Sequence, residues 1–244
     1  MLIMNEITLE RMNALRLTGM REAFERMLQA KTAEALTADQ AVAMLINAEW
    51  DARNSRRVEY RLKNAHFRYK ACMAEIDYVH NRGLDRNQIA RLSDCAFVRN
   101  AESVLVVGPT GVGKSYIASS LGEQACQMGY KVLYQNATRL FTQLKMKKVD
   151  GSYIDEIEKL GKNDLLILDD LFLQPLDSNA SLALMEIMED RYARKALIIT
   201  SQYPPDKWWD MIKDKTIADA LLDRLINTSH KIMLQGESMR RKKQ

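Results

Sequence analysis

The sequence lacks the long apolar runs that a membrane helix requires. Runs such as residues 165–168 are far shorter than the roughly 20 residues needed to cross a bilayer. The three cysteines are scattered, so they indicate neither a disulfide framework nor a metal-binding spacing. The amino terminus shows neither a basic leader nor a small-residue cleavage site. We therefore expect a cytoplasmic protein without a secretory signal or a membrane partner.

Proline is also scarce, and its distribution divides the chain. All four prolines lie beyond residue 100, and no internal repeat is present. Before that point, apolar residues recur at three- and four-residue spacing over 9–28, and similar patterns follow at 37–46 and 50–66. We therefore predict a helical first part of the chain.

Beyond residue 100, short β-branched runs alternate with helical patterns. Strands are predicted at 103–107, 131–135, 164–168, 196–200 and 231–234, with helices at 116–127, 139–147 and 180–194. Alternation of this kind is typical of a mainly parallel sheet with helices on both faces. The predicted fold class is therefore α/β, with a five-stranded, mainly parallel sheet behind a small all-helical domain. With 244 residues, the chain has room for both parts.

The net charge of +4 hides an uneven distribution. Residues 53–70 carry seven basic residues and one acid, and residues 240–243 are all basic. Concentrated positive charge on an otherwise mildly acidic chain is typical of a protein that binds a polyanion. A solvated helix face and a frayed tail explain the same pattern equally well, so both interpretations stay open at this point.

Residues 108–115, GPTGVGKS, match the P-loop (Walker A) pattern G-x-x-x-x-G-K-[ST]. They follow an apolar strand and open a helix, which is the context that the motif needs. Glycines allow the backbone N–H groups to point inward at phosphate, and the helix start adds its positive dipole end. Lys114 is expected to reach the outer phosphates and Ser115 to bind Mg²⁺. An accidental glycine-rich turn is a much weaker explanation of the full match.

Two acids follow the next buried strand, in the segment LLILDD at 165–170. Ligands of parallel sheets bind at the carboxyl ends of the strands. We expect Asp169 to hold Mg²⁺, directly or through water, and Asp170 to polarise the attacking water. Alone, such a pair caps a loop as readily as it binds a metal, but after a P-loop it favours a Walker B motif.

Thr200 and Ser201 end the following strand, where a polar side chain can sense the γ-phosphate. A simple strand-end turn into Pro204 and Pro205 is an equally good explanation of these two residues.

Taken together, these segments resemble the IstB-like ATP-binding helper proteins of insertion sequences, AAA+ ATPases related to the DnaC helicase loaders. The P-loop alone is generic. The resemblance is specific because it also includes the basic stretch 49–69, the segments 82–92 and 199–212, IADALLDRLI at 217–226 and GESMR at 236–240.

This resemblance implies an AAA+ fold and three domain ranges: a helical DNA-binding and assembly domain at 1–70, a linker at 71–100 and the ATPase domain at 101–244. It implies ATP and Mg²⁺ as cofactors. The nucleotide would be bound by Gly108, Pro109, Thr110, Gly111, Val112, Gly113, Lys114, Ser115, Tyr116 and, by a looser match, Arg240. Mg²⁺ would be held by Ser115 and Asp169, and Asp170 stands where the wider AAA+ pattern has glutamate, which predicts slow hydrolysis.

The resemblance further implies catalytic roles for Lys114, Asp169, Asp170, Thr200 and Ser201. Arg224 matches an arginine finger that enters the site of a neighbouring subunit. From the residues alone, Arg224 is better explained by an ion pair within its own helix, with Asp219 or Asp223.

The implied function is ATP-dependent assembly on double-stranded DNA, as a ring or a helical filament of identical copies, with recruitment and stimulation of a transposase. Hydrolysis would drive disassembly. Candidate DNA contacts are Arg53, Arg56, Arg57, Arg61, Lys63, Lys145, Lys147 and Lys148. A helicase loader is the alternative with the same ATPase core. A monomeric P-loop kinase of small metabolites is a third possibility, but we find no lid arginines or acceptor pocket for it.

Overall fold

The computed structural model describes residues 2–30, 36–79, 82–226 and 229–239. The chain forms two compact units, Met1–Tyr60 and Arg61–Gln244. The division falls inside helix α3 (Ala38–Ala65), ten residues before the domain boundary expected from the sequence. Among the described residues, no helix combines the length and the apolar character needed to span a membrane.

The first unit is helical. It contains α1 (Leu2–Ala14), α2 (Thr18–Gln29) and most of α3. The apolar period predicted a helix over 9–28, but the chain turns between α1 and α2, where Arg16 has a positive φ of 58°. In contrast, the two helices predicted at 37–46 and 50–66 form the single helix α3.

Helices α2 and α3 approach closely at Gly19. A Cβ added there would lie 2.3 Å from the carbonyl oxygen of Ala48, so no larger residue fits without movement of α3. Next to this contact, the buried carboxylate of Glu49 accepts hydrogen bonds from the Met20 backbone N–H at 3.1 Å and from Arg53 Nε at 2.6 Å. A small residue and a buried polar contact therefore join the two helices.

The second unit is built on a parallel sheet in the order β2-β3-β4-β1-β5. The strands are β1 (Ser103–Val107), β2 (Val132–Asn136), β3 (Leu165–Leu171), β4 (Ala196–Ser201) and β5 (Ser229–Met233). The five-stranded sheet predicted from the sequence is confirmed, and each strand overlaps its predicted range. Because β4 lies between β1 and β3, the carboxyl ends of these three strands meet at one edge.

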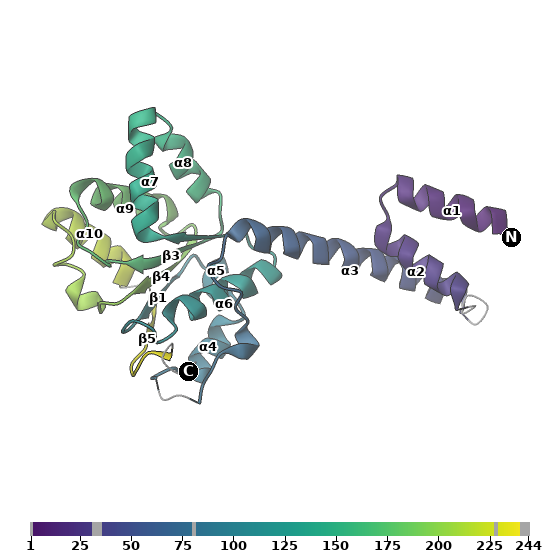
Figure 1. Cartoon of the computed structure of the whole chain (residues 1–244), viewed down its shortest axis with the longest axis horizontal. Coiled ribbons are helices and arrows are strands. Elements are labelled where there is room, and N and C mark those ends of the chain that lie inside the picture. Colours follow the sequence, from purple (N-terminus) through teal and green to yellow (C-terminus); the bar gives the residue numbers. More distant parts are fainter. Residues whose placement is uncertain (1, 31–35, 80–81, 227–228, 240–244) are drawn as a thin grey trace. The chain divides into compact units, whose positions relative to one another are not determined.

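Helices cover both faces of the sheet (Figure 1). Val104 and Val106 face one core, which is shared with α6 (Lys114–Gln127), α4 (Arg86–Leu92) and α5 (Ala96–Arg99). Leu105 and Val107 face the other core, which is shared with α7 (Ala137–Asp150), α8 (Tyr153–Gly161), α9 (Ser178–Arg191) and α10 (Lys215–Ile226). Alternate side chains of β1 therefore contribute to two apolar layers, one on each face of the sheet.

Residues 71–100 are not a plain connection. They contain a short 3₁₀ helix (Met73–Glu75), α4 and α5. Ile89 and Phe97 are buried in the same core as α6. The segment that the sequence analysis assigned to a linker thus packs as part of the second unit.

A buried arginine fixes the start of the central strands. The Arg191 guanidinium donates to the backbone carbonyls of Leu160, Asn163, Asp164 and Ala196 at 2.7–3.2 Å. Burial lowers its pKa to about 10, which still leaves it charged at neutral pH. Since Asp164 directly precedes β3 and Ala196 is the first residue of β4, Arg191 helps to hold these strands in register.

Candidate nucleotide site

The loop between β1 and α6 turns tightly. Gly111 and Gly113 have φ values of 87° and 96°, a region that other residues rarely adopt. Added Cβ atoms would lie 2.0 Å from Ser238 Oγ at Gly111 and 2.6 Å from Arg82 Nη1 at Gly113. The backbone angles therefore favour glycine at both positions, and a Cβ would also displace the Ser238 and Arg82 side chains.

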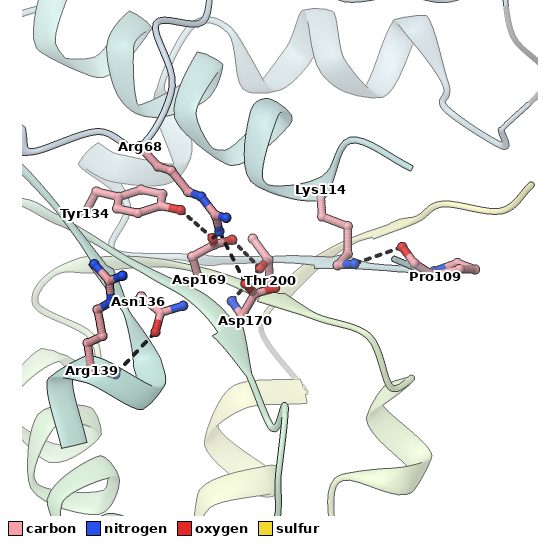
Figure 2. Close-up of polar contacts among 9 residues, drawn as sticks. All are labelled: Arg68, Pro109, Lys114, Tyr134, Asn136, Arg139, Asp169, Asp170 and Thr200. Atoms are coloured by element: carbon pink, nitrogen blue, oxygen red, sulfur yellow. Dashed lines mark hydrogen bonds and ion pairs between the residues drawn. The ribbon is translucent and has the colours of Figure 1, made fainter. Parts of the chain in front are cut away.

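Lys114, the first residue of α6, is 5% exposed. Its Nζ donates to the backbone carbonyl of Pro109 at 2.9 Å, so the ammonium group folds back over the loop (Figure 2). A buried ammonium over a glycine-rich loop at the start of a helix suits an anion with several oxygens.

Asp169 lies at the carboxyl end of β3 and is fully buried. Thr200 Oγ1 donates to Asp169 Oδ1 at 2.6 Å, and the Tyr134 hydroxyl donates to Asp169 Oδ2 (Figure 2). Burial, together with the nearby Asp169 carboxylate, raises the pKa of Tyr134 well above its ordinary value. Tyr134 therefore remains a proton donor at all physiological pH values, and the two donors hold the Asp169 carboxylate in one orientation.

Asp170 follows at an irregularity in the β3–β4 pairing, between Leu168 and Leu171. Its backbone N–H donates to Thr200 Oγ1 at 2.9 Å, and its side chain is 22% exposed. Its φ of 57° rotates the side chain away from the regular strand direction. Consecutive residues of one strand normally point to opposite faces, so this bulge lets both carboxylates contact the same cation, Arg68.

A cavity of about 630 Å³ collects most of these groups. It is lined by Arg68, Tyr69, Glu75, Asp77, Arg82, Thr110, Gly111, Gly113, Lys114, Ser115, Tyr116, Asp170, Gln202 and Met239. Of the predicted nucleotide ligands, five residues of the P-loop and Tyr116 thus face one space with Asp170. Gly108, Pro109 and Val112 belong to the same loop without lining the cavity, and Arg240 lies outside the described residues.

Thr200 and Ser201 have different surroundings, although the sequence analysis assigned them one role. The Thr200 hydroxyl bonds to the Asp169 carboxylate and to the Asp170 backbone N–H. Ser201 Oγ accepts from the Tyr203 backbone N–H at 3.2 Å, and its carbonyl accepts from Gly108 N–H at 3.1 Å. Gln202, which directly follows β4, lines the cavity instead. Thr200 is therefore the better placed of the two to influence the acids.

Arg82 is a site residue that the sequence analysis did not single out. It is buried, and its guanidinium donates to the carbonyls of Val112 at 2.8 Å and Asp77 at 2.6 Å. Burial lowers its pKa. Since Val112 belongs to the P-loop, Arg82 connects this loop to Asp77, which also lines the cavity. Only its position in the family-like segment 82–92 pointed to it.

The residues present fit a hydrated divalent cation bound together with phosphate. In the described parts of the chain, no cluster of three or more histidine, cysteine or acidic side chains forms a complete metal cage. Mg²⁺ is usually held by one or two carboxylates plus substrate phosphates. Ser115 and Asp170 line one cavity, and the buried Asp169 carboxylate lies next to Asp170, which matches that chemistry.

Comparison with known proteins agrees with this geometry. The family described as "IstB-like ATP binding protein" matches residues 10–244. A putative insertion sequence ATP-binding protein of Sinorhizobium fredii is 41% identical over 96% of both chains. The insertion sequence IS21 putative ATP-binding protein of Pseudomonas aeruginosa is 30% identical over 89% of this chain and 82% of its own. The chain belongs to the IstB-like ATP-binding protein family.

Solved structures show the same fold as this IstB-like chain. DnaI aligns with a TM-score of 0.60 at 18% identity, over 72% of this chain and 93% of its own. The DnaC helicase loader aligns with a TM-score of 0.52 at 18% identity, over 71% and 98%. The replication initiator DnaA, solved with AMPPCP and single-stranded DNA, gives 0.55 at 19% identity, over 68% and 51%. The predicted AAA+ P-loop fold is thereby confirmed.

In this family member, Arg224 lies on α10 and forms an ion pair with Glu189 of α9. This partner lies on a neighbouring helix, in addition to the acids of the same helix that the sequence suggested. Arg224 borders a cavity together with Ser103 and Leu197, near the amino ends of β1 and β4. The P-loop follows the carboxyl end of β1, so Arg224 lies at the other end of the sheet from the nucleotide cavity of its own chain.

The basic residues of α3 are largely on the surface. Arg53, Arg56, Arg57 and Lys63 are exposed or half-exposed, and Arg61 is half-buried. Arg53 and Arg56 both form ion pairs with Glu49, at 2.6 and 3.7 Å. The apolar side of the basic stretch packs as predicted, since Ala65 is buried and Leu62 lies against the core. Part of the basic surface thus also serves the α2–α3 contact.

The three candidate lysines lie on the last two turns of α7. Lys147 pairs with Asp150 at 3.7 Å, and Lys148 lies 4.7 Å from the centre of the Tyr153 ring. Lys145 is exposed and, with Lys148, borders a cavity of about 280 Å³ that extends to Asp170. The structure therefore places these lysines on a helix followed by α8, which the sequence analysis did not predict.

Proposed function

We propose that this IstB-like ATP-binding protein is an Mg²⁺-dependent ATPase that assembles on double-stranded DNA and recruits and stimulates a transposase. The observation that carries the ATPase proposal is the cavity shared by Lys114, Ser115 and Asp170, with Asp169 held behind it by two hydrogen bonds. Phosphate, a divalent cation and an attacking water all have a matching group there.

In this proposal the P-loop backbone and Lys114 bind the phosphates, and Ser115 and Asp169 hold Mg²⁺. The bound metal would neutralise charge on the phosphate oxygens. Asp170 orients the attacking water. Aspartate is one methylene shorter than the usual glutamate, so hydrolysis is expected to be slow, which suits a timer of disassembly.

Replacement of Lys114 tests nucleotide binding. Lys114→Ala removes a charged group from the phosphate site, and we expect ATP affinity to fall by about two orders of magnitude or more, because a charged hydrogen bond in a buried site contributes about 3 kcal/mol. Titration with a fluorescent ATP analogue measures the affinity. Lys131→Ala, at an exposed lysine of the same unit, is the matched control. ATP-dependent assembly on DNA that survives Lys114→Ala contradicts the proposal.

For DNA binding we propose backbone contacts by the basic stretch of α3, together with Lys145, Lys147 and Lys148. Replacing Arg56, Arg57 and Arg61 with alanine should weaken duplex binding and reduce its salt dependence, by about 0.9 in the log–log slope for each phosphate that is no longer neutralised. The matched control replaces Arg91, Arg99 and Arg194, three exposed arginines outside α3, and so removes equal charge. A slope that falls equally in both variants would mean that only net charge matters.

The transposase partner is proposed from the relatives, whose names place them in insertion sequences. The helicase-loader alternative has only fold-level support, from structures at 18% identity. Co-purification with a transposase supports the first function, and co-purification with a hexameric helicase supports the second. We place this activity in the cytoplasm, where ATP and genomic DNA occur together.

A further inference from the structure

A positively charged side chain already faces the two acids of the site. The chain leaves α3 at His66, whose φ is 56°, and Arg68 follows two residues later. Arg68 Nη1 lies 3.8 Å from Asp169 Oδ2 and 3.6 Å from Asp170 Oδ2 (Figure 2). One guanidinium therefore pairs with both carboxylates, and it reaches them from a segment far from the P-loop and from β3 in the sequence.

The contact has an electrostatic reason. Asp169 is fully buried, and two adjacent carboxylates repel each other unless a cation lies between or beside them. Partial burial by itself would lower the pKa of Arg68, but the surrounding Tyr69, Tyr134, Asp169 and Asp170 raise it overall. Arg68 is thus a permanent positive charge that offsets part of the negative charge of the pair.

One of these carboxylates, Asp169, is also the carboxylate assigned to Mg²⁺ in the proposed site. A protein-bound Mg²⁺ lies about 2.1 Å from its oxygen ligands and brings two positive charges, so a guanidinium within 4 Å of the same atoms is repelled. We propose that Arg68 is a resident counter-cation of the Asp169–Asp170 pair, which holds the two carboxylates before nucleotide arrives and leaves them when Mg²⁺ binds. This inference rests on the nucleotide and metal site proposed above.

Arg68 is suited to such an exchange because it is not locked in place. Its side chain is 48% exposed, and besides the two carboxylates it contacts the Tyr69 ring, 5.3 Å from the ring centre. Arg191, in contrast, is 1% exposed and donates to four backbone carbonyls. Arg68 can therefore swing toward solvent without unfolding a strand, which Arg191 cannot do.

The test is the affinity of the nucleotide-free protein for Mn²⁺, a spectroscopic substitute for Mg²⁺, measured by electron paramagnetic resonance. Arg68→Gln removes the competing charge, and we expect Mn²⁺ to bind at least about fivefold more tightly, the effect of losing roughly one kcal/mol of competition from a partly exposed ion pair. Arg68→Lys keeps the charge and should remain close to the original protein.

Two further variants locate the effect. Arg139→Gln removes an exposed arginine from α7 beside the end of β2, where its backbone N–H donates to Asn136 (Figure 2). It should leave Mn²⁺ affinity unchanged. Asp169→Asn should weaken Mn²⁺ binding several-fold. If Asp169→Asn has no effect, the proposed metal site is wrong. If Asp169→Asn weakens Mn²⁺ binding while Arg68→Gln and Arg139→Gln have the same Mn²⁺ affinity, only the proposed role of Arg68 is wrong.

A measurement on the unmodified protein covers the case in which Arg68→Gln does not fold. The arginine Nε–H signals in a ¹⁵N NMR spectrum report each guanidinium, and Arg68→Lys identifies the signal of Arg68. Adding the non-hydrolysable analogue AMPPCP without metal should change this signal little, and adding Mg²⁺ afterwards should shift it strongly. An Arg68 signal that does not respond to Mg²⁺ would overturn the proposal.

Discussion

At the scale of single residues, Thr200 determines how the two acids are presented. Its hydroxyl donates to Asp169 Oδ1 at 2.6 Å and accepts from Asp170 N–H at 2.9 Å. One fully buried side chain on β4 thus contacts both acidic residues of β3. Two hydrogen bonds through one hydroxyl also hold the bulge that brings the acids to a common cation.

We predict that Thr200→Val leaves ATP binding intact but reduces hydrolysis about tenfold or more, because the Asp169 carboxylate loses a donor and the Asp170 N–H loses its acceptor. Leaving these buried groups unpaired should also lower the free energy of unfolding by about 1–3 kcal/mol. Steady-state turnover and thermal unfolding measure both effects. Ser201→Ala, which removes a hydroxyl bonded only to the Tyr203 N–H among the described contacts, is the control and should retain turnover.

At the scale of elements, the P-loop has glycine at position 113 for two reasons, a positive φ and a close neighbouring side chain. Gly113→Ala tests both. A Cβ at Gly113 meets Arg82 Nη1 at 2.6 Å in addition to the strain of a φ of 96°. Gly151, which ends α7 with a φ of 80°, has no atom within 4 Å of an added Cβ. Both alanine variants should lose about 1–2 kcal/mol of stability from backbone strain.

Only Gly113→Ala is expected to lose ATP affinity, since only there does the new methyl group displace a residue that holds the P-loop. Isothermal titration with ATP and thermal unfolding of both variants separate the two effects. Equal ATP affinity in Gly113→Ala and Gly151→Ala would show that the Arg82 contact does not shape the phosphate site.

The pairing of α2 and α3 predicts a pH dependence in the first unit. Burial of Glu49 alone would raise its pKa, but hydrogen bonds from Arg53 and the Met20 N–H outweigh this and lower the pKa below 4.5. A depressed folded-state pKa means that the stabilisation is complete above about pH 4.5 and is lost as the pH falls further.

Hydrogen exchange of the α2 amides, corrected for the intrinsic effect of pH, should therefore accelerate below about pH 4.5. Glu49→Gln should exchange rapidly at neutral pH and show little further change on acidification. Glu25→Gln, which breaks the half-exposed pair between Glu25 and Arg21, is the control, because such pairs contribute under about 1 kcal/mol. Indistinguishable exchange in the two variants would contradict the role of Glu49.

At the scale of the whole molecule, the sequence predicted most of what local patterns encode. The β3 strand was predictable because Leu165–Leu168 form a continuous apolar run followed by two acids, and the P-loop because its spacing is distinctive. Helix α8 was missed, although Ser152 precedes it and two acids lie in its first turn. No local sequence pattern predicted the order of the strands in the sheet.

The site residues that sequence analysis missed are those brought in by tertiary contacts. Tyr134 reaches Asp169 from β2, and Arg82 reaches the P-loop across 30 residues of sequence. Arg68 belonged to a basic stretch that suggested DNA, and only the fold shows it beside two acids. The function of a charged residue in a basic stretch therefore has to be assigned from its contacts in the folded structure, because its neighbours in the sequence do not determine it.

The predicted role of Arg224 in hydrolysis can be tested only in an assembly of several copies. Arg224 lies near the amino end of β1, away from the nucleotide cavity of its own chain, so a direct contact between Arg224 and a bound nucleotide has to involve a neighbouring copy. We expect Arg224→Ala to bind ATP normally and to lose at least about a hundredfold in DNA-stimulated turnover, since an arginine finger contributes about 10³–10⁵ in related enzymes. Turnover assays and sedimentation with duplex DNA measure this.

The decisive control uses the pair that Arg224 forms within its own chain. Glu189→Gln breaks the same ion pair but keeps the arginine. If Arg224 acts on a neighbouring copy, this variant should retain turnover. If the ion pair is only structural, its turnover should fall as in Arg224→Ala. Mixing inactive Arg224→Ala with inactive Lys114→Ala adds a second test. An intact site on one copy then meets an intact arginine on the next, and turnover should reappear. Because no monomer in that mixture carries both groups, recovered activity has no other source than a site shared between copies.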